Sequence, residues 1–298
     1  MKEGSPSTTA INSAMVRASH LLLDTEPKIF RDDFALALSG IGDEAALRAA
    51  LDKRDEPLAR EFGRDFAEFV AGTLRSIMTM RSRFTEEELE KAIGRGICQY
   101  MLLGAGLDSF ALRRRDLAEV LKVFEIDHSS SQQWKRARIS ELGIALPSNL
   151  TFVPVDFERE TVFERLGSSA YQPKARAFFS WLGVTQYLTK EAVRNTLRQI
   201  ATAAAVESEI VFEYTVPQEL VDERHRKYLA IVIPRVAEMG EPWLSFFSPG
   251  ELAEQLREMG FDEISHFGPA EAYTRYFAGR TDRLPCQTVH RLIRARVG

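Results

Sequence analysis

The chain has 298 residues, 45% of them hydrophobic, so it is long enough to bury the core of one large α/β domain or two smaller ones. A net charge of -4 excludes the strongly basic surface typical of nucleic-acid-binding proteins. No apolar run approaches the roughly 18 residues of a membrane-spanning helix, and the polar stretch 1–10 lacks the apolar core of a secretory signal. We therefore expect a cytoplasmic protein with neither a nucleic acid nor a membrane as partner.

The first third of the chain is predicted to be helical. The phenylalanines within 62–70 recur at the spacing of one face of an amphipathic helix. Thr85 followed by Glu88 matches a capping box and predicts that a further helix starts there. We expect residues 1–97 to form an N-terminal helical segment that acts as a lid on a Rossmann-like domain of residues 98–298.

From about residue 97 the pattern alternates between short apolar runs and helical stretches. Thr189, for example, is placed to cap a helix that continues through Ala204. Such alternation is typical of an α/β protein with a doubly wound, mostly parallel sheet. Residues 217–247 read as a helical insertion over the site, and a closing pair of strands follows it. The predicted strands are 100–103, 122–126, 150–154, 175–180, 209–214, 264–267 and 288–297.

A glycine turn follows the first predicted strand, and acidic residues end the second. Gly104 and Gly106 allow a sharp backbone turn and a close approach to a ligand. An acid at the end of the next strand, here Glu125 or Asp127, can accept hydrogen bonds from a ribose. Ser109 stands where a dinucleotide fingerprint has its third glycine, so the turn by itself is also compatible with a tight strand–helix connection that binds nothing.

Several spaced motifs together resemble the leucine carboxyl methyltransferase family, and more closely its bacterial branch of S-adenosyl-L-methionine-dependent methyltransferases. The resemblance covers nearly the whole chain and includes RSRF at 81–84 and FSP at 247–249. Motifs that recur in the right order are far more specific than one glycine turn. The main motifs are LLGAGLDS (102–109), FEID (124–127), PVDF (154–157) and SWLGVTQYLT (180–189). The fold that the resemblance implies is that of the class I methyltransferases.

The resemblance implies that S-adenosyl-L-methionine is the cofactor and that the glycine turn helps to bind it. The loop of Gly104, Ala105 and Gly106 would pass beneath the methionine part of the cofactor. Asp127, or alternatively Glu125, would hold the ribose hydroxyls. No metal is expected, because the five histidines and two cysteines fall into none of the usual metal-binding spacings.

Further cofactor contacts are implied on other elements. Asp156 would accept from the adenine amino group, with Phe157 beside the ring, and Arg81 would pair with the cofactor carboxylate. Relatives often carry Glu-Gly where this chain has Leu182 followed by glycine, so we expect Trp181 to line the pocket instead. The alternatives are structural: Asp156 as a helix cap, Trp181 as core and Arg81 in a surface ion pair.

The catalytic residues are not identified by the sequence. A carboxylate acceptor needs no general base because it is already ionised, whereas a hydroxyl needs one. Tyr214, at the end of the fifth strand, and His225, in the insertion, are weak candidates for that base.

We expect methyl transfer to a carboxylate or hydroxyl oxygen of a small molecule or a peptide C-terminus. One competing function is an NAD(P)-dependent oxidoreductase on a similar sheet. Ser109 and the lack of a Tyr-x-x-x-Lys pair oppose that function. Another is a regulatory protein that binds the cofactor without catalysis. The sequence does not indicate the oligomeric state.

Overall fold

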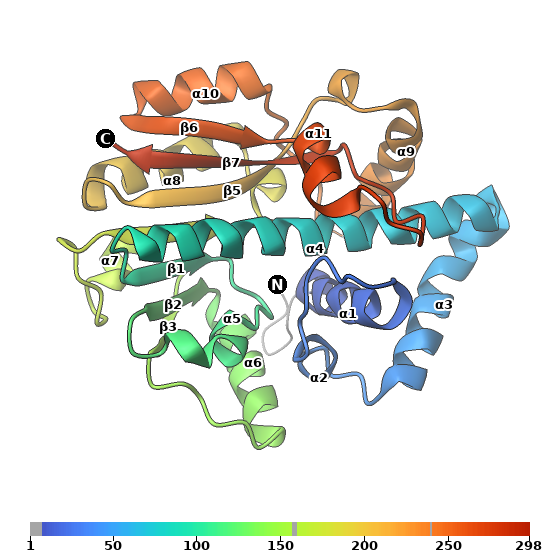
Figure 1. Cartoon of the computed structure of the whole chain (residues 1–298), viewed down its shortest axis with the longest axis horizontal. Helices are drawn as coiled ribbons and strands as arrows, with labels where there is room; N and C mark the ends of the chain where they lie inside the picture. The colour runs from blue at the N-terminus through green and yellow to red at the C-terminus, as the bar shows by residue number, and fades with distance from the viewer. Residues whose placement is uncertain (1–7, 157–159, 239) are drawn as a thin grey trace.

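The computed structural model describes residues 8–156, 160–238 and 240–298, and a seven-stranded sheet forms its centre (Figure 1). The strand order is β3-β2-β1-β4-β5-β7-β6. Neighbouring strands from β3 to β5 are parallel, and β7 is antiparallel to both β5 and β6. The predicted mostly parallel sheet and its closing strand pair are confirmed. The strands are β1 (Gln99–Leu103), β2 (Lys122–Asp127), β3 (Leu150–Pro154), β4 (Ala177–Trp181), β5 (Glu209–Thr215), β6 (Phe261–Phe267) and β7 (His290–Val297).

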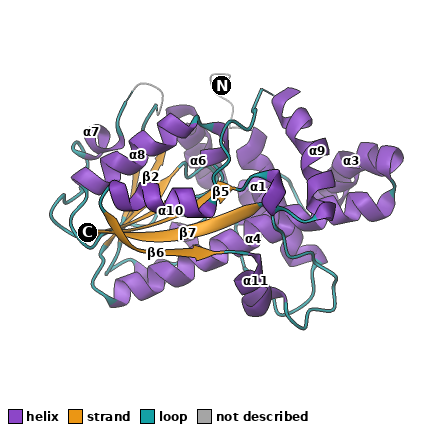
Figure 2. Cartoon of the chain, turned by 90° about the horizontal axis from the view of Figure 1, so that it is seen from above, coloured by secondary structure: helices purple, strands orange, loops and turns teal. Residues whose placement is uncertain are grey.

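Both faces of the sheet are covered, so the central strands β1, β4 and β5 are buried along their whole length. Successive side chains of a strand point to opposite faces. Tyr100 and Phe178 therefore pack against α4 (Arg64–Gly94) on one face. Met101 and Phe179 belong to the core on the other face, with α8 (Lys190–Ala203). Figure 2 shows the sheet lying between these two helices. This burial on both sides is typical of parallel sheets.

Within residues 8–97, the described part of the predicted helical lead-in, there are four helices, and the last of them, α4, corrects one expectation. Thr85 does not start a helix, because α4 runs without interruption through that position. A capping threonine needs an extended backbone. The apolar stripe of α4, however, continues past Thr85 to Leu89, and packing of that stripe keeps the segment helical. Side chains of α4 and of the sheet belong to one core. The domain boundary at residue 97 stays a prediction. The other three helices of this N-terminal segment are α1 (Thr8–Leu23), α2 (Ala35–Leu38) and α3 (Glu44–Phe62).

One predicted helix cap lies in the part of the chain that follows β1. Thr189 is confirmed as the N-cap of α8, since its side chain accepts a hydrogen bond from the Ala192 N–H over 3.2 Å. The remaining helices are α5 (Phe110–Arg113), α6 (Ser129–Glu141), α7 (Val162–Leu166), α9 (Glu223–Glu238), α10 (Pro249–Glu258) and α11 (Pro269–Ala272). No helix in the described part of the chain is both long and apolar enough to cross a bilayer.

In their described part, residues 217–247 contain the long helix α9 and, after it, a segment that is neither helix nor strand, 240–247. The Leu244 N–H donates to the Gln186 carbonyl over 2.6 Å, and the Phe247 N–H donates to the Thr215 carbonyl over 2.9 Å. Tyr228 and Phe247 are buried in the core against the sheet. The insertion is therefore packed over the carboxyl ends of β4 and β5. Whether it covers a substrate stays a prediction.

Candidate functional site

The glycine turn lies at the carboxyl end of β1, in contact with the end of β2 and with the loop after β4. Gly104 and Gly106 both have positive φ angles, +68° and +50°. The Gly104 N–H donates to the Ile126 carbonyl over 2.8 Å. A Cβ atom on Gly104 would lie 2.5 Å from Cγ2 of Val184, in the loop after β4. Glycine is thus required at position 104 both for its backbone conformation and for its close approach to the neighbouring loop.

We expect Gly104→Ala to destabilise the protein more than Gly143→Ala. Both glycines have nearly the same φ, but a Cβ atom on Gly143 meets nothing within 4 Å. The strain of a positive φ costs roughly 1–2 kcal/mol at either position, and overpacking against Val184 adds about 1–3 kcal/mol at position 104. Urea unfolding of both variants measures the difference. Equal losses would show that Val184 moves aside freely.

The two acids of β2 have different surroundings. Asp127, at the strand's carboxyl end, accepts hydrogen bonds from the Gly106 N–H (2.5 Å) and the His128 N–H (2.6 Å). Burial raises the Asp127 pKa, and these two N–H groups oppose the rise. The Glu125 carboxylate is buried and lies 2.6 Å from Nζ of Lys135 on α6. Burial raises the pKa of Glu125 to about 7 in spite of the Lys135 charge. Asp127 is therefore the acid in direct contact with the glycine turn.

Arg81 extends from α4 to the same edge of the sheet. Its Nη1 lies 2.7 Å from Oε2 of Glu213 on β5. Its guanidinium also lies against Gly183, after β4, where a Cβ atom would be 2.5 Å from Nη1. Arg81 is thus in a buried ion pair and not in the surface pair that was its structural alternative. The structure brings Arg81 together with the loop that contacts Gly104, as a shared site requires.

The predicted adenine contacts lie after β3. Asp156 is partly exposed two residues beyond the end of the strand, and its backbone N–H donates to Oε2 of Glu160 over 3.2 Å. Phe157 lies outside the described residues. The roles of these two residues stay predictions.

Three other candidates are held in the interior. Trp181 is fully buried in the core, and its Nε1 has no hydrogen-bond partner in the part of the chain that the structure describes. The Tyr214 hydroxyl lies 2.8 Å from Nδ1 of His266, and burial raises the Tyr214 pKa. His225 lies 2.5 Å from Asp222, and burial lowers its pKa. The contacts observed for Tyr214 and His225 do not include the glycine turn or Arg81.

The N-terminal end of α1 lies over the glycine turn. Ala10 is the nearest neighbour that a Cβ atom on Gly106 would meet, at 3.4 Å. Arg17 donates to the Leu107 carbonyl over 2.7 Å and pairs with Asp32, also over 2.7 Å. Thr9 donates to Glu241, in the segment that follows α9. These contacts fix α1 against the glycine turn, and its action as a lid stays a prediction.

Two titratable residues of this edge, Glu213 and His290, were missed in the sequence. Glu213 lies in a strand that is otherwise apolar or aromatic over most of its length, and His290 begins β7. Glu213 could have been recognised as a candidate, because it is an acidic residue inside a strand that was predicted to be buried. His290 offered no local signal, because it lies next to β5 only through antiparallel pairing with Thr215.

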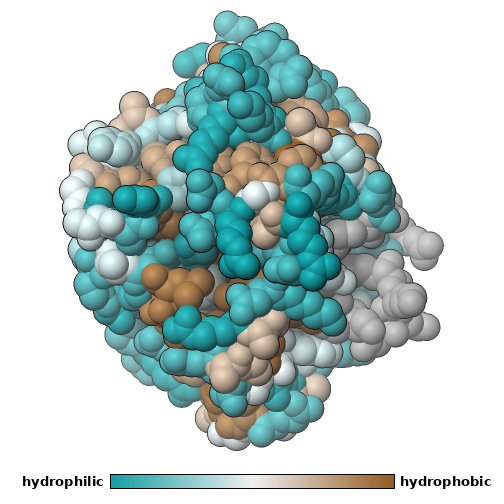
Figure 3. Space-filling model, turned by 90° about the vertical axis from the view of Figure 1, so that its right-hand side faces the viewer, coloured by the Kyte–Doolittle hydropathy of each residue, from teal (hydrophilic) through white to brown (hydrophobic). Residues whose placement is uncertain are grey.

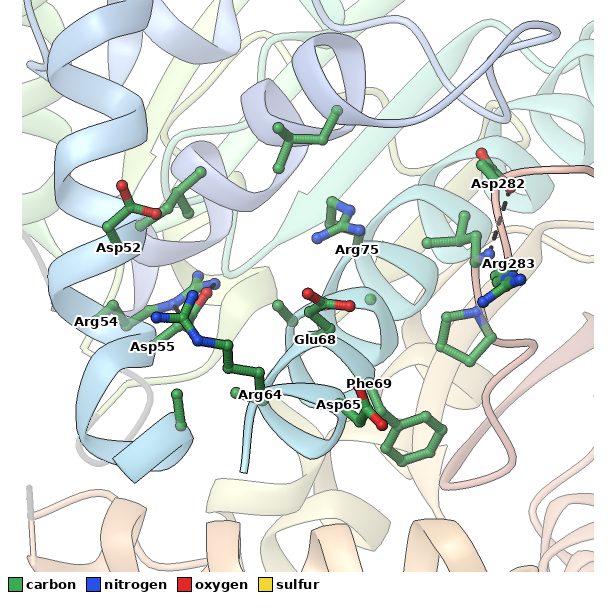
Figure 4. Close-up of a pocket in the computed structure, with 18 of the residues that line it drawn as sticks. Asp52, Arg54, Asp55, Arg64, Asp65, Glu68, Phe69, Arg75, Asp282 and Arg283 are labelled. Carbon is green, nitrogen blue, oxygen red and sulfur yellow. Dashed lines mark hydrogen bonds and ion pairs between the residues drawn. The ribbon is translucent and has the colours of Figure 1, made fainter. Parts of the chain in front are cut away.

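A pocket of about 940 Å³ lies elsewhere, between α3, α4 and the segment 282–285. Figure 4 shows Arg54, Asp55 and Arg64 grouped on one side of it, and Asp282 on the other. Leu23 lines this pocket, whereas Ala10 lies at the glycine turn, and 13 helical residues span about 20 Å. Figure 3 shows the face of the molecule that forms the right-hand side of Figure 1, and this face is mostly hydrophilic with separate apolar patches. This pocket is therefore separate from the glycine turn and the residues around it.

Comparisons with known proteins identify the family of the chain. The model of the family described as leucine carboxyl methyltransferase matches residues 10–201. YktD of Bacillus subtilis, whose name assigns it to the S-adenosyl-L-methionine-dependent methyltransferases, is 28% identical over 303 residues, covering 97% of this chain and 98% of the relative.

Solved structures share the fold. A Thermobifida fusca protein described as a methyltransferase has a TM-score of 0.58 at 16% identity and covers 99% of this chain and 96% of its own. A DUF574 family protein from Streptomyces avermitilis has a TM-score of 0.59 at 14% identity and covers 83% of this chain and 90% of its own. At these identities the likeness concerns the fold alone.

Proposed function

Because the chain belongs to the leucine carboxyl methyltransferase family, we propose that it transfers a methyl group from S-adenosyl-L-methionine to an oxygen atom of its acceptor. The observation that carries the proposal is the bond between Asp127 and the Gly106 N–H, which joins the glycine turn of β1 to the acid of β2. Ligands of open α/β sheets bind at this carboxyl edge. We take the acceptor to be a small molecule or a peptide C-terminus.

The residues at this edge fit the cofactor in charge and shape. Gly104 and Gly106 have positive φ angles and no side chain of their own to hold a ligand away from the backbone, and Ala105 lies between them. Asp127 is the acid that we assign to the ribose hydroxyls, because Glu125 is already paired with Lys135. We assign Asp156 and Phe157 to the adenine.

Arg81 supplies a guanidinium for the cofactor carboxylate. Its present partner, Glu213, is a carboxylate too, so the geometry around Nη1 suits that group. Trp181 is assigned to packing beneath the site and not to direct contact, because it is fully buried.

The main requirement of the reaction is that the protein aligns the acceptor atom with the methyl group of the cofactor. The bound cofactor supplies a methyl group on a sulfonium, which is a good leaving group. The protein holds the nucleophile in line with the methyl carbon and sulfur, and such positioning lowers the barrier substantially. The α1 helix and the segment 240–247 cover the edge and exclude water from it.

The proposal predicts that S-adenosylhomocysteine binds in the micromolar range and NADH does not. Isothermal titration calorimetry of the purified protein with each compound tests this. Binding of NADH without S-adenosylhomocysteine would overturn the proposal and favour an oxidoreductase. Tight S-adenosylhomocysteine binding without methyl transfer to any acceptor would instead favour a regulatory protein.

A further inference from the structure

A buried carboxylate faces a buried histidine at the edge where we propose that the methyl donor binds. Glu213 is fully buried, and Arg81 occupies its Oε2. Its Oε1 has no hydrogen-bond partner among the described residues and lies 4.0 Å from Nδ1 of His290. Native proteins satisfy nearly all buried polar atoms, and each exception calls for an explanation, of which a catalytic role is one. The unsatisfied oxygen therefore indicates more than packing.

His290 is held in place from several elements. Its Nδ1 lies 3.2 Å from Oγ1 of Thr215, and its ring packs against Trp243 with centroids 5.3 Å apart. The charged groups that act on it are Glu213 on β5 and Arg81 on α4. Burial lowers the His290 pKa, Arg81 lowers it further, and Glu213 opposes both. His290 is therefore neutral near pH 7 and able to accept a proton.

We propose that His290 is the general base for a hydroxyl-bearing acceptor and that Glu213 stabilises the imidazolium that forms; this inference rests on the methyltransferase function proposed above. In the step, a bond forms between the acceptor oxygen and the methyl carbon while the carbon–sulfur bond breaks. The electron pair of that bond stays on sulfur, and the hydroxyl proton passes to His290. With Nδ1 directed at Thr215 and Glu213, Nε2 is the nitrogen that receives it.

The charges at this edge favour a hydroxyl over a carboxylate acceptor. A carboxylate acceptor would bring a second negative charge next to Glu213. Arg81 could not offset it, because its charge is shared with Glu213 and is assigned to the cofactor carboxylate. A neutral hydroxyl carries no such penalty, and its need for a base explains why a histidine is buried here.

The same geometry couples the base to the cofactor. In S-adenosyl compounds, a short methylene chain links the sulfur to the amino-acid carboxylate, so a carboxylate bound by Arg81 places sulfur nearby. When Arg81 turns to that carboxylate, its hold on Glu213 weakens and more of the Glu213 charge acts on His290. The histidine therefore becomes more basic when the cofactor is bound.

A histidine titration tests this coupling without a known acceptor. We would follow the five histidine side chains of the full chain by NMR against pH, assigning His290 with His290→Gln. The ligands are S-adenosylhomocysteine and 5′-methylthioadenosine, which lacks the amino-acid carboxylate. We expect S-adenosylhomocysteine to move the His290 midpoint to higher pH, 5′-methylthioadenosine to leave it in place, and Glu213→Gln to abolish the movement.

The outcomes separate the two proposals. If S-adenosylhomocysteine binds but the His290 midpoint does not move, or moves equally with 5′-methylthioadenosine, the inference about His290 is wrong and the methyltransferase function stands. If S-adenosylhomocysteine does not bind at all, the proposed function fails and the inference fails with it.

Methyl transfer from labelled cofactor provides a second readout, with 4-methylphenol, 4-nitrophenol and benzoate as probes. We expect alkali-stable ether products, and an alkali-labile ester as the main product would overturn the inference. His290→Gln should lower transfer to 4-methylphenol about 100-fold and keep S-adenosylhomocysteine affinity. The loss should be much smaller with 4-nitrophenol, which ionises without help, and a merely structural role would lower both rates alike.

Discussion

Lys135→Met is expected to lower the free energy of unfolding by about 3–5 kcal/mol at pH 8, and by much less at pH 5.5. Lys135 is 1% exposed, and its Nζ lies 2.6 Å from Glu125 and 2.5 Å from the Asp108 carbonyl. Methionine keeps the length of the side chain but removes the charge. Glu125 would then be a buried carboxylate without a counter-ion, which is among the most destabilising changes in a core.

The pH dependence follows from the raised pKa of Glu125. In the folded protein that pKa is about 7, against an ordinary value of 4.5, so the folded state holds this proton more tightly than the unfolded chain. The contribution of Glu125 to stability is therefore full below about 4.5 and is lost as the pH rises through about 7. With a pKa of about 7, Glu125 is already largely neutral at pH 5.5, and removing Lys135 raises that pKa further. At pH 5.5 there is therefore little ion pairing to lose.

Urea unfolding at both pH values measures the effect. Lys122→Met is the matched control, because Lys122 is an exposed lysine at the start of the same strand, and its loss should stay within about 0.5 kcal/mol. The double variant with Glu125→Gln should recover much of the stability. An equal loss for Lys135→Met at pH 5.5 and pH 8 would contradict the assigned charge state.

Asp127→Ala is expected to weaken S-adenosylhomocysteine binding at least about 100-fold. A carboxylate that accepts from both ribose hydroxyls contributes roughly 3 kcal/mol through two charge-assisted hydrogen bonds, which corresponds to that factor. The alanine variant also frees the Gly106 and His128 N–H groups that Asp127 now satisfies, so the glycine turn is expected to loosen. Calorimetric titration gives the affinity, and thermal melting shows whether the variant is folded.

The control for this prediction is Glu125→Gln, which changes the other acid of β2. We expect it to keep the affinity within about threefold, because Glu125 faces Lys135 beneath the turn. Asp127→Asn, which retains one acceptor oxygen, should fall between wild type and Asp127→Ala. If Glu125→Gln loses the ligand while Asp127→Ala keeps it, the ribose assignment is reversed.

Local sequence patterns predicted an element correctly where all the residues that define it lie in one short segment. The apolar runs that predicted β1, β2 and β3 do form strands, and Thr189 caps α8 as its side chain predicts. The same local reasoning was wrong at Thr85, where a sequence that matches a capping box lies inside a continuous helix. A capping pattern does not report whether the preceding residues continue an apolar stripe against the sheet.

The choice between Glu125 and Asp127 shows the limit of a single strand. The two residues are two positions apart, so alternation gives them the same face of β2. Only the position of α6, which brings Lys135 to Glu125, and the turn after β1, which brings the Gly106 N–H to Asp127, separate their roles.

The sequence alone determined the α/β class, the mostly parallel sheet, the glycine turn with its acids and the family, because each depends on residues close together in the chain or on motifs in order. The tertiary structure decided which side chains meet. Arg81, Glu213 and His290 come from α4, β5 and β7, and their partnership exists only because the helix crosses the sheet and β7 pairs antiparallel with β5. Ion pairing and burial depend on distance in space, which no pattern along the chain records.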